Sequence, residues 1–218
     1  MEIVRLSEVG AEIAALRAAE VLRAGGVILY PTDTLYGLGA DALSDEAVEK
    51  VQQIKGREEG KPIHCIVADT KMAGEYGEFN GTAHRLAKEF LPGPLTIVVE
   101  KKAGLDSGIA RGIGTIGIRI PKNEFCLTLA RAFGKPYTTT SANASGRKTP
   151  TTVEGILEQL GESAENISLI IEAGELPDSQ PSTVVGVSGS DVVVLREGAI
   201  PAADIWTVLG LEPREETV

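Results

Sequence analysis

The chain has 218 residues, 43% of them hydrophobic, and a formal net charge of −10 at neutral pH. This composition supports a sizeable core and excludes a fibrous protein. The acidic balance argues against salt-driven binding of nucleic acid over the whole surface, so an anionic ligand would need a local basic patch. No apolar run approaches the roughly 18 residues of a membrane span, and the N-terminus does not resemble a signal peptide. We therefore expect a cytoplasmic protein that does not associate with membranes.

The two cysteines, Cys65 and Cys126, lie in apolar stretches far apart in the sequence. Together with the two histidines, His64 and His84, they show no metal-ligand spacing. We expect both cysteines to be buried and reduced, and we expect no metal site built from side chains.

The first predicted element is a helix over residues 8–24, with Ser7 as its N-cap. Its spacing places Ile13 and Leu16 on the apolar side. A glycine pair then ends the helix and precedes the next element.

The stretch VILYPTDTLYGLGADA, at 27–42, begins with a short apolar run that predicts a buried strand at 27–30. Pro31 marks its end because proline has no N–H to donate to a sheet. A polar loop follows with the hydroxyl groups of Thr32, Thr34 and Tyr36, and its glycines can adopt positive φ. Loops carried on a rigid strand commonly hold binding groups.

Strands and helices then alternate along the rest of the chain, which indicates an α/β fold. Strands are expected at 63–68, 95–99, 115–121, 167–172, 182–187 and 191–196, and helices at 44–55, 82–90, 123–133, 151–160 and 202–209. The expected N-caps of the first four of these helices are Ser44, Thr82, Asn123 and either Thr151 or Thr152. The two last strands form a predicted hairpin, so we expect a mixed sheet. No repeat or linker divides the chain, and we expect one domain over 1–218 with a polar tail at 211–218.

In the strand at 115–121, side chains alternate between the two faces. Ile116 and Ile118 point to the core. Thr115 and Arg119 point to the other face, which we expect to be bare and polar. Arg119 is predicted either to contact a ligand or to form a structural ion pair.

Polar candidates for a binding site fall at strand ends, in loops or on this polar face. They are Thr32, Thr34, Tyr36, Lys55, Arg57, Lys61, Thr115, Arg119, Thr139, Ser141, Asn143, Thr149, Ser182 and Arg196. Cations, hydroxyl groups and glycines together suit a phosphate-bearing anion. Neither G-x-x-x-x-G-K-[ST] nor G-x-G-x-x-G after a strand occurs, so the standard nucleotide-binding motifs do not apply.

Structural interpretations of the same residues stay open at this point. The cations at 55–61 can form a solvated surface loop. Ser141 and Asn143 can form a turn or a helix cap. Tyr36 can be a packing residue, and we interpret His64 as a core residue.

Seven stretches, taken in chain order, resemble the YrdC-like threonylcarbamoyl-AMP synthase family. They are YPTDTLYGLGADA, KGR followed by KP, PGPLT, TIGIRIP, TTSANASG, PSTVV and LREG. The resemblance covers about residues 7–200. It implies a single-domain, twisted, mixed parallel and antiparallel sheet flanked by helices, similar to the dihydroxybutanone-phosphate synthase fold, with a concave basic cavity. The implied activity is nucleotidyl transfer, in which L-threonine, bicarbonate and ATP give threonylcarbamoyl-adenylate and pyrophosphate for threonylcarbamoyladenosine (t6A) modification of tRNA.

The resemblance also implies roles for individual residues. L-Threonine would be held by Thr34, Arg119, Thr139 and Ser182, in a pocket shaped by Thr32 and Tyr36. ATP would be contacted by Arg57, Lys61, Thr115, Ser141, Thr149 and Arg196. The catalytic signature at the phosphates would consist of Lys55, Arg57, Ser141 and Asn143.

Mg²⁺ is the implied cofactor, held mainly by the phosphates of ATP and not by side chains. The implied partner is the downstream tRNA threonylcarbamoyl transferase machinery, with weak or no direct binding of nucleic acid. The chain departs from the family pattern at Ile66, where many relatives have a histidine. The alternative is a YrdC-like nucleotide-binding or RNA-binding paralogue without synthase activity.

Overall fold

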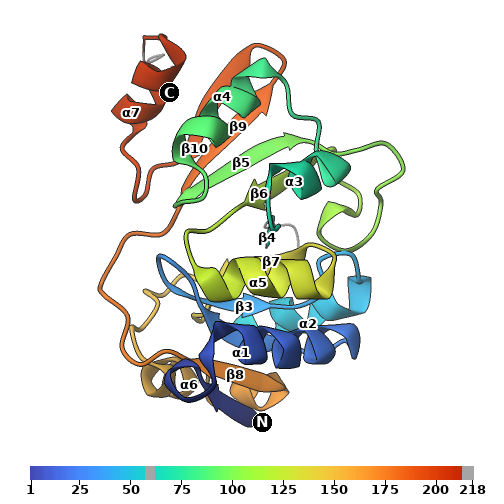
Figure 1. Ribbon diagram of the computed structural model, residues 1–218, viewed down its shortest axis with the longest axis vertical. Coiled ribbons are helices and arrows are strands. Elements are labelled where there is room, and N and C mark those ends of the chain that lie inside the picture. The colour runs from blue at the N-terminus through green and yellow to red at the C-terminus, as the bar shows by residue number, and fades with distance from the viewer. Residues whose placement is uncertain (57–61, 213–218) are drawn as a thin grey trace.

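Ten strands form one mixed sheet in the part of the chain that the computed structural model describes, residues 1–56 and 62–212 (Figure 1). Their order across the sheet is β1-β8-β2-β3-β7-β4-β6-β5-β9-β10. The strands are β1 (Glu2–Arg5), β2 (Ile28–Pro31), β3 (Tyr36–Gly39), β4 (His64–Ile66), β5 (Leu95–Glu100), β6 (Thr115–Arg119), β7 (Tyr137–Ser141), β8 (Leu169–Glu172), β9 (Thr183–Ser188) and β10 (Asp191–Arg196). Parallel pairs such as β4 with β6 stand beside antiparallel pairs such as β5 with β6, which confirms the predicted mixed α/β sheet.

Helices cover both faces of the sheet (Figure 1). They are α1 (Leu6–Arg23), α2 (Asp45–Lys55), α3 (Thr70–Tyr76), α4 (Gly81–Phe90), α5 (Glu124–Phe133), α6 (Val153–Leu160) and α7 (Ala202–Leu209). One hydrophobic cluster joins α1 and α5 to strands β2, β7 and β8. A second cluster, on the opposite face, joins α2, α4, α6 and α7 to the sheet.

Helix α1 differs from its prediction at both its start and its apolar side. Ser7 lies inside the first turn instead of capping it, and the helix is interrupted at Gly10, where φ is 77°. Ile13 and Leu16 are 60% and 53% exposed, contrary to the prediction. The buried side consists of alanines and one leucine: Ala14, Ala15, Ala18, Ala19 and Leu22. Small side chains allow α1 to pack closely against α5.

The predicted polar loop after β2 is shorter than expected, because Tyr36–Gly39 form a second strand, antiparallel to β2. Only 32–35 remain as the turn of this hairpin. Gly37 and Gly39 do not have positive φ. A Cβ on Gly39 would lie 2.9 Å from a ring carbon of Tyr30, so glycine is needed for the close approach of that ring.

The hydroxyl-rich run 137–141, for which the sequence showed no strand alternation, is the central strand β7. Thr138 explains how a polar residue fits there: its buried hydroxyl donates to the Leu38 carbonyl and accepts from the Ala40 N–H. Because the Thr138 hydroxyl is paired, its burial is tolerated.

Several further boundaries were correct, and some elements were not predicted. Ser44, Asn123 and Thr152 cap α2, α5 and α6 as expected. Strand β1 and helix α3 were not predicted, and Asn80, not Thr82, caps α4. Both cysteines are buried and free.

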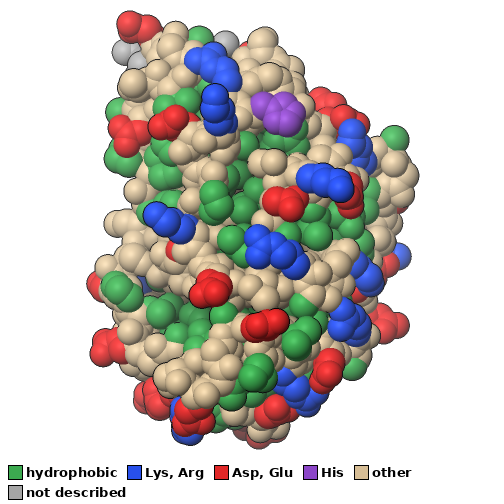
Figure 2. Space-filling view, viewed as in Figure 1, with side chains coloured by type: hydrophobic (Ala, Val, Ile, Leu, Met, Phe, Trp, Pro, Cys, Tyr) green, Lys and Arg blue, Asp and Glu red, His purple; other side chains and the backbone are tan. Residues whose placement is uncertain are grey.

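On the face shown in Figure 2, Lys and Arg side chains are interspersed with Asp and Glu side chains. Arg17 illustrates the pattern, because its guanidinium pairs with Glu2 at 2.6 Å and Glu20 at 2.8 Å. None of the described helices combines the length and the apolar character that crossing a membrane would require.

Candidate active site

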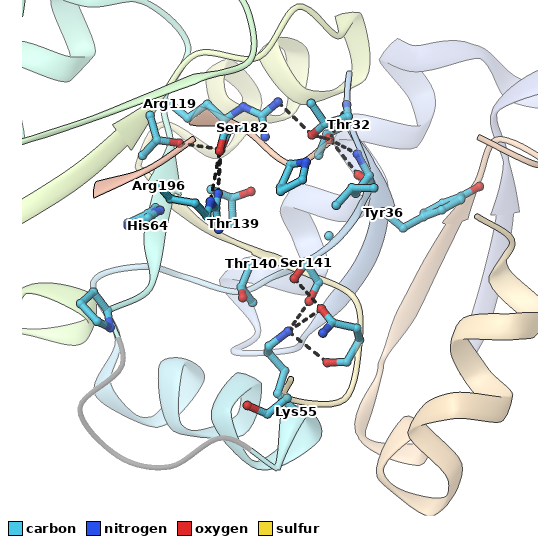
Figure 3. Close-up of a pocket in the computed structure, with 18 of the residues that line it drawn as sticks. Thr32, Tyr36, Lys55, His64, Arg119, Thr139, Thr140, Ser141, Ser182 and Arg196 are labelled. Atoms are coloured by element: carbon cyan, nitrogen blue, oxygen red, sulfur yellow. Dashed lines mark hydrogen bonds between the residues drawn. The ribbon is translucent and has the colours of Figure 1, made fainter. Parts of the chain in front are cut away.

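A cavity of about 290 Å³ opens near the middle of the sheet, where strands from distant parts of the sequence come together (Figure 3). Its lining comes from the 32–35 turn, from the end of α2, from strands β3, β4, β5, β6, β7 and β10, and from the segments after β7 and before β9. The lining residues with polar or charged side chains are Thr32, Thr34, Tyr36, Lys55, His64, Thr96, Arg119, Thr139, Thr140, Ser141, Asn143, Ser145, Ser182 and Arg196.

The position of the cavity follows from strand alternation. Ile66 and Tyr137 belong to the cluster under α1 and α5. His64 and Thr139 lie two residues away on the same strands, and therefore on the same face. His64 and Thr139 line the cavity. The same face of the sheet is therefore covered by α1 and α5 at Ile66 and Tyr137, and open to the cavity at His64 and Thr139.

Arg119, on β6, dominates one end of the cavity, which we call the Arg119 end. It is 4% exposed, and its Nη2 donates to Asp33 Oδ1 at 2.5 Å and to Thr34 Oγ1 at 3.1 Å. Its Nε is buried and has no hydrogen-bond partner among the described residues. The structure therefore contains the ion pair that was one interpretation of Arg119, and it leaves a buried donor on the same guanidinium.

The hydroxyls of the 32–35 turn support this end. Thr32 Oγ1 accepts from the backbone N–H groups of Thr34 and Leu35, which fixes the turn. Thr32 Oγ1 also lies 3.1 Å from Thr34 Oγ1. Thr34 thus presents its hydroxyl beside the guanidinium of Arg119.

Tyr36 lines the cavity with its buried side chain, but its hydroxyl points away from it (Figure 3). That hydroxyl donates to the Gly174 carbonyl at 2.7 Å and accepts from the Ala173 N–H at 2.9 Å. Burial raises the pKa of the Tyr36 phenol. The hydroxyl therefore anchors β3 to the chain after β8, as the packing interpretation expected.

Ser182 closes the same end from the segment before β9. Its Oγ lies 3.0 Å from Thr96 Oγ1, and Arg196 Nη2 donates to its carbonyl oxygen at 2.7 Å. The backbone at Ser182, just before β9, therefore holds Arg196 against the cavity wall.

Lys55, at the C-terminus of α2, organises the opposite end, which we call the Lys55 end. It is buried, and its Nζ donates to the carbonyl oxygens of Ser141 and Asn143 and to Asn143 Oδ1. Asn143 Oδ1 also accepts from Ser141 Oγ and from Thr149 Oγ1. A cation next to hydroxyl and amide groups is an arrangement that suits phosphate oxygens.

The loop after β7 is also held from outside the cavity. Gln159 on α6 accepts from the Ala144 N–H at 2.9 Å and donates to the Lys148 carbonyl at 3.0 Å. Asn143 Nδ2 donates to the carbonyl oxygens of Ala144 and Arg147. These bonds give the 144–148 loop a defined shape.

A second cavity, of about 460 Å³, adjoins the first and shares Leu35, Ser141, Pro181 and Arg196 with it. Its remaining lining is Arg147, Lys148, Thr149, Asp178, Ser179 and Gln180. Ser141 and Arg196 therefore stand at the boundary between the two cavities.

The predicted site residues are not all brought to the first cavity. Thr149 is buried behind Asn143 and lines the second cavity. Thr115 is exposed at the other end of β6 and lines neither cavity. Arg57 and Lys61 lie outside the described residues.

His64 and Gly117 lie in surroundings that differ from those predicted from the sequence. His64 is partly exposed and lines the cavity instead of lying in the core, whereas its neighbour Cys65 is fully buried. A Cβ on Gly117 would lie 2.3 Å from a ring carbon of His64, so the face of β6 that was expected to be bare is covered by the imidazole. Strand alternation relative to Cys65 could have indicated that His64 points away from the core.

Among the described residues, no group of three or more His, Cys, Asp or Glu side chains could hold a metal ion. No carboxylate is among the lining residues of the first cavity. Mg²⁺ prefers carboxylate and phosphate oxygens, so this donor set fits Mg²⁺ only when a ligand brings oxygens of its own.

Comparison with known proteins shows what the chain is similar to. The family model of Sua5, YciO and YrdC, described as "Telomere recombination", matches residues 20–198. A protein of Methanocaldococcus jannaschii named "Putative threonylcarbamoyl-AMP synthase" is 39% identical over 177 residues, which cover 81% of this chain and 82% of that protein. The threonylcarbamoyl-AMP synthase of Pyrococcus abyssi is 34% identical over 194 residues, which cover 88% of this chain and 56% of that protein.

Solved structures agree with these matches. P. abyssi Sua5 complexed with L-threonine superposes with a TM-score of 0.85 at 34% identity, covering 96% of this chain and 60% of that one. E. coli YciO superposes with a TM-score of 0.75 at 30% identity, covering 86% of this chain and 90% of that one. The chain thus spans little more than half of the P. abyssi protein and most of the M. jannaschii protein and YciO. The extent of the family match, the ordered sequence motifs and the shared fold together mean that this chain belongs to the Sua5/YciO/YrdC family.

Proposed function

We propose that this protein is a threonylcarbamoyl-AMP synthase, which converts L-threonine, bicarbonate and ATP into threonylcarbamoyl-adenylate and pyrophosphate. The observation that carries the proposal is the Arg119 end of the cavity, where a 4% exposed guanidinium keeps a buried Nε without a partner among the described residues. A buried charged donor without a partner is costly, and a substrate carboxylate would remove that cost. The names of similar proteins support the same activity, and so does the solved complex of P. abyssi Sua5 with L-threonine.

In this proposal, the carboxylate of L-threonine binds at the Arg119 end. Thr34, Thr139 and Ser182 offer hydroxyl groups around it. Arg119 Nη2 is already engaged by Asp33, so we expect the substrate to use other N–H groups of the guanidinium, with Nε the clearest candidate. The threonine amine then points along the cavity toward the Lys55 end.

ATP is proposed to bind across the Lys55 end and the second cavity, because Ser141 and Arg196 line both. Lys55, Ser141 and Asn143 would face the phosphates. Arg57 and Lys61, which belong to the same proposal from the sequence, lie outside the described residues. Thr115 is the residue of the predicted ATP set whose observed position supports this role least, because it lines neither cavity.

Chemically, CO₂ from the dehydration of bicarbonate is captured by the neutral threonine amine, which releases a proton to solvent as the carbamate forms. A carbamate oxygen attacks the α-phosphorus of ATP, and the bond from that phosphorus to the leaving pyrophosphate breaks. The chain's own residues align the two reactants and neutralise charge, which is how proteins accelerate such transfers without a covalent intermediate. Mg²⁺, bound to the phosphates, would supply further charge neutralisation.

The same proposal includes the biological setting expected from the sequence. The product would be consumed by tRNA threonylcarbamoyl transferase machinery in the cytoplasm, and the protein itself would bind nucleic acid weakly or not at all. The net charge of −10 supports the latter point, and so do the interspersed charges on the face shown in Figure 2, because a phosphate backbone favours contiguous basic surface.

The test is the release of pyrophosphate by the pure protein given ATP, bicarbonate and L-threonine. We expect release that depends on threonine. Equal release with threonine omitted would refute the proposal, and tight ATP binding without any release would favour the paralogue that lacks synthase activity.

A further inference from the structure

We infer that Asp33 is a positioning residue, which holds the guanidinium of Arg119 in the orientation that receives the carboxylate of the amino-acid substrate. This role, which rests on the proposed function, follows from the contacts of the Asp33 and Arg119 side chains.

Both oxygens of the Asp33 carboxylate are occupied. Oδ1 accepts from Arg119 Nη2 at 2.5 Å, and Oδ2 accepts from the backbone N–H of Lys122 at 3.0 Å. The Asp33 side chain is only 10% exposed and that of Arg119 only 5%. The carboxylate therefore joins the β2–β3 turn to the connection between β6 and α5, and it is fixed by two elements at once.

The contacts of Arg119 Nη2 use both of its N–H groups. One is directed to Asp33, and the other to Thr34 Oγ1 at 3.1 Å. Because guanidinium is planar and rigid, two fixed acceptors on one nitrogen set the direction of the donors on the others. Nε is then a buried donor in a fixed direction, without a partner among the described residues.

Asp33 could instead compete with the substrate for the guanidinium, and then its removal would tighten binding. The geometry favours positioning, because the carboxylate is also held by the Lys122 N–H, which is not part of the cavity lining. An arginine without this anchor would have to lose its side-chain freedom on binding, which weakens affinity. It would also be a buried cation with no described carboxylate beside it, and such a group tends to rearrange.

The test compares Asp33→Asn with a matched control, Asp41→Asn, by steady-state kinetics of threonine-dependent pyrophosphate release. Asp41 also has one oxygen on a cation, Lys135, at 3.0 Å, and one on a backbone N–H, Leu43, at 2.9 Å. Its side chain is 12% exposed, and it does not line either cavity. The two variants thus lose similar contacts, one beside the cavity and one away from it.

We expect Asp33→Asn to raise the KM for L-threonine roughly tenfold, as for a lost charge-assisted hydrogen bond, with the KM for ATP changed by less than about twofold. Asp41→Asn should change neither KM by more than about twofold. A merely structural role of Asp33 would lower the active fraction, which reduces kcat and leaves both KM values unchanged.

A second arm places Asp33→Asn in an Arg119→Lys background, where the planar donor is absent. There the effect of Asp33→Asn on the threonine KM should shrink to less than about twofold, because the two residues act as one unit. If thermal unfolding shows that Asp33→Asn does not fold, Asp33→Glu takes its place, with an expected rise of about threefold or more from the displaced carboxylate.

The inference is overturned if the threonine KM is unchanged or lower in the folded Asp33 variant, if both KM values rise equally, or if the effect persists in the Arg119→Lys background. Failure of the proposed function has a different signature, since the unmodified protein would then release no pyrophosphate in response to threonine. The positioning inference would fall with it.

Discussion

The two ends of the cavity are built in different ways. At the Arg119 end, a guanidinium is paired with a buried carboxylate and is surrounded by the hydroxyls of a tight turn. At the Lys55 end, the described contacts of the ammonium are carbonyl and amide oxygens of one loop. The first end is rigid and directional. The second is a lysine at the end of α2, bound to a loop that is itself held by side chains.

The two constructions suit different kinds of anion. A planar cation anchored by a carboxylate leaves few donors in fixed directions, which matches a single small carboxylate. A lysine that shapes a loop with hydroxyl, amide and backbone groups offers many donors over a larger surface, which matches a polyphosphate. The predictions below test whether the two ends act separately.

The largest effect is expected from Arg119→Ala. Loss of the guanidinium removes the proposed carboxylate contact, and kcat/KM for L-threonine should fall roughly 100-fold. Binding of ATP, measured by calorimetry, should change by less than about threefold. Equal loss of both ligands would show that Arg119 is structural, and circular dichroism would show whether the variant has unfolded.

The next largest effect is expected from Lys55→Met, which keeps the length of the side chain but removes its charge and its three donors. The carbonyl oxygens of Ser141 and Asn143 would lose their cation, so the KM for ATP should rise roughly 30-fold. Threonine binding should change little. If the threonine KM rises as much as the ATP KM, the two ends are coupled and the division proposed above is wrong.

Gly117→Ala should give an intermediate effect on the cavity wall. The new methyl group would lie 2.3 Å from the His64 ring, and the imidazole must therefore move. We expect activity to fall about tenfold, with a loss of about 1–2 kcal/mol in the free energy of unfolding from overpacking. Gly114→Ala is the matched control, because a Cβ there meets nothing within 4 Å. Wild-type activity in Gly117→Ala would mean that the position of His64 does not matter.

A smaller effect is expected from Gln159→Leu, which removes both bonds that hold the 144–148 loop. Each neutral hydrogen bond contributes about 1 kcal/mol, and much of that is replaced by water at this partly exposed site. The KM for ATP should therefore rise about threefold, with the threonine KM unchanged. A raised KM for threonine with an unchanged KM for ATP would show that the loop serves the Arg119 end instead.

The smallest effect at neutral pH is expected from the cysteines. Burial raises the pKa of the Cys65 and Cys126 thiols to about 12. Both remain protonated at neutral pH. Treatment of the native protein with a maleimide should therefore leave the KM for threonine and the KM for ATP unchanged. Rapid inactivation would contradict the burial of these thiols.

The raised pKa of the two thiols also makes the protein less stable as the pH becomes alkaline. In the unfolded chain a thiol releases its proton near its ordinary pKa of about 8.5. In the folded protein the pKa of each thiol is about 12, so the thiol stays protonated to higher pH. Above about pH 9 the unfolded state binds fewer protons, so stability falls by up to about 1.4 kcal/mol per pH unit for each thiol. Urea unfolding at pH 8 and pH 10 should show this loss, and Cys65→Ala should make it less steep.

Local patterns were sufficient for the parts of the fold that depend on neighbours in sequence. Alternating isoleucines in β6 and the caps at Ser44 and Asn123 were read correctly, because each depends on hydrogen bonds or on strand geometry within a few residues. The ordered motifs also identified the family, and the candidates Thr32 and Thr34, chosen from the sequence, do line the cavity.

Other assignments needed the packed sheet. Ile13 and Leu16 fit an apolar helix face, but the close approach of α5 selected the alanine side instead. The run around Thr139 became a strand because β3 and β4 supply hydrogen-bond partners from distant segments.

The candidate site shows the same division. From its own sequence, Arg119 could be predicted to sit on the polar face of a strand. Its partner Asp33 lies 86 positions away in the sequence, and no local pattern connects the two. Residue types and spacing were enough to predict hydroxyls and cations of the kind that suit an anionic ligand. Which of them meet depends on the packed sheet, because strand pairing brings together groups that are far apart in the sequence.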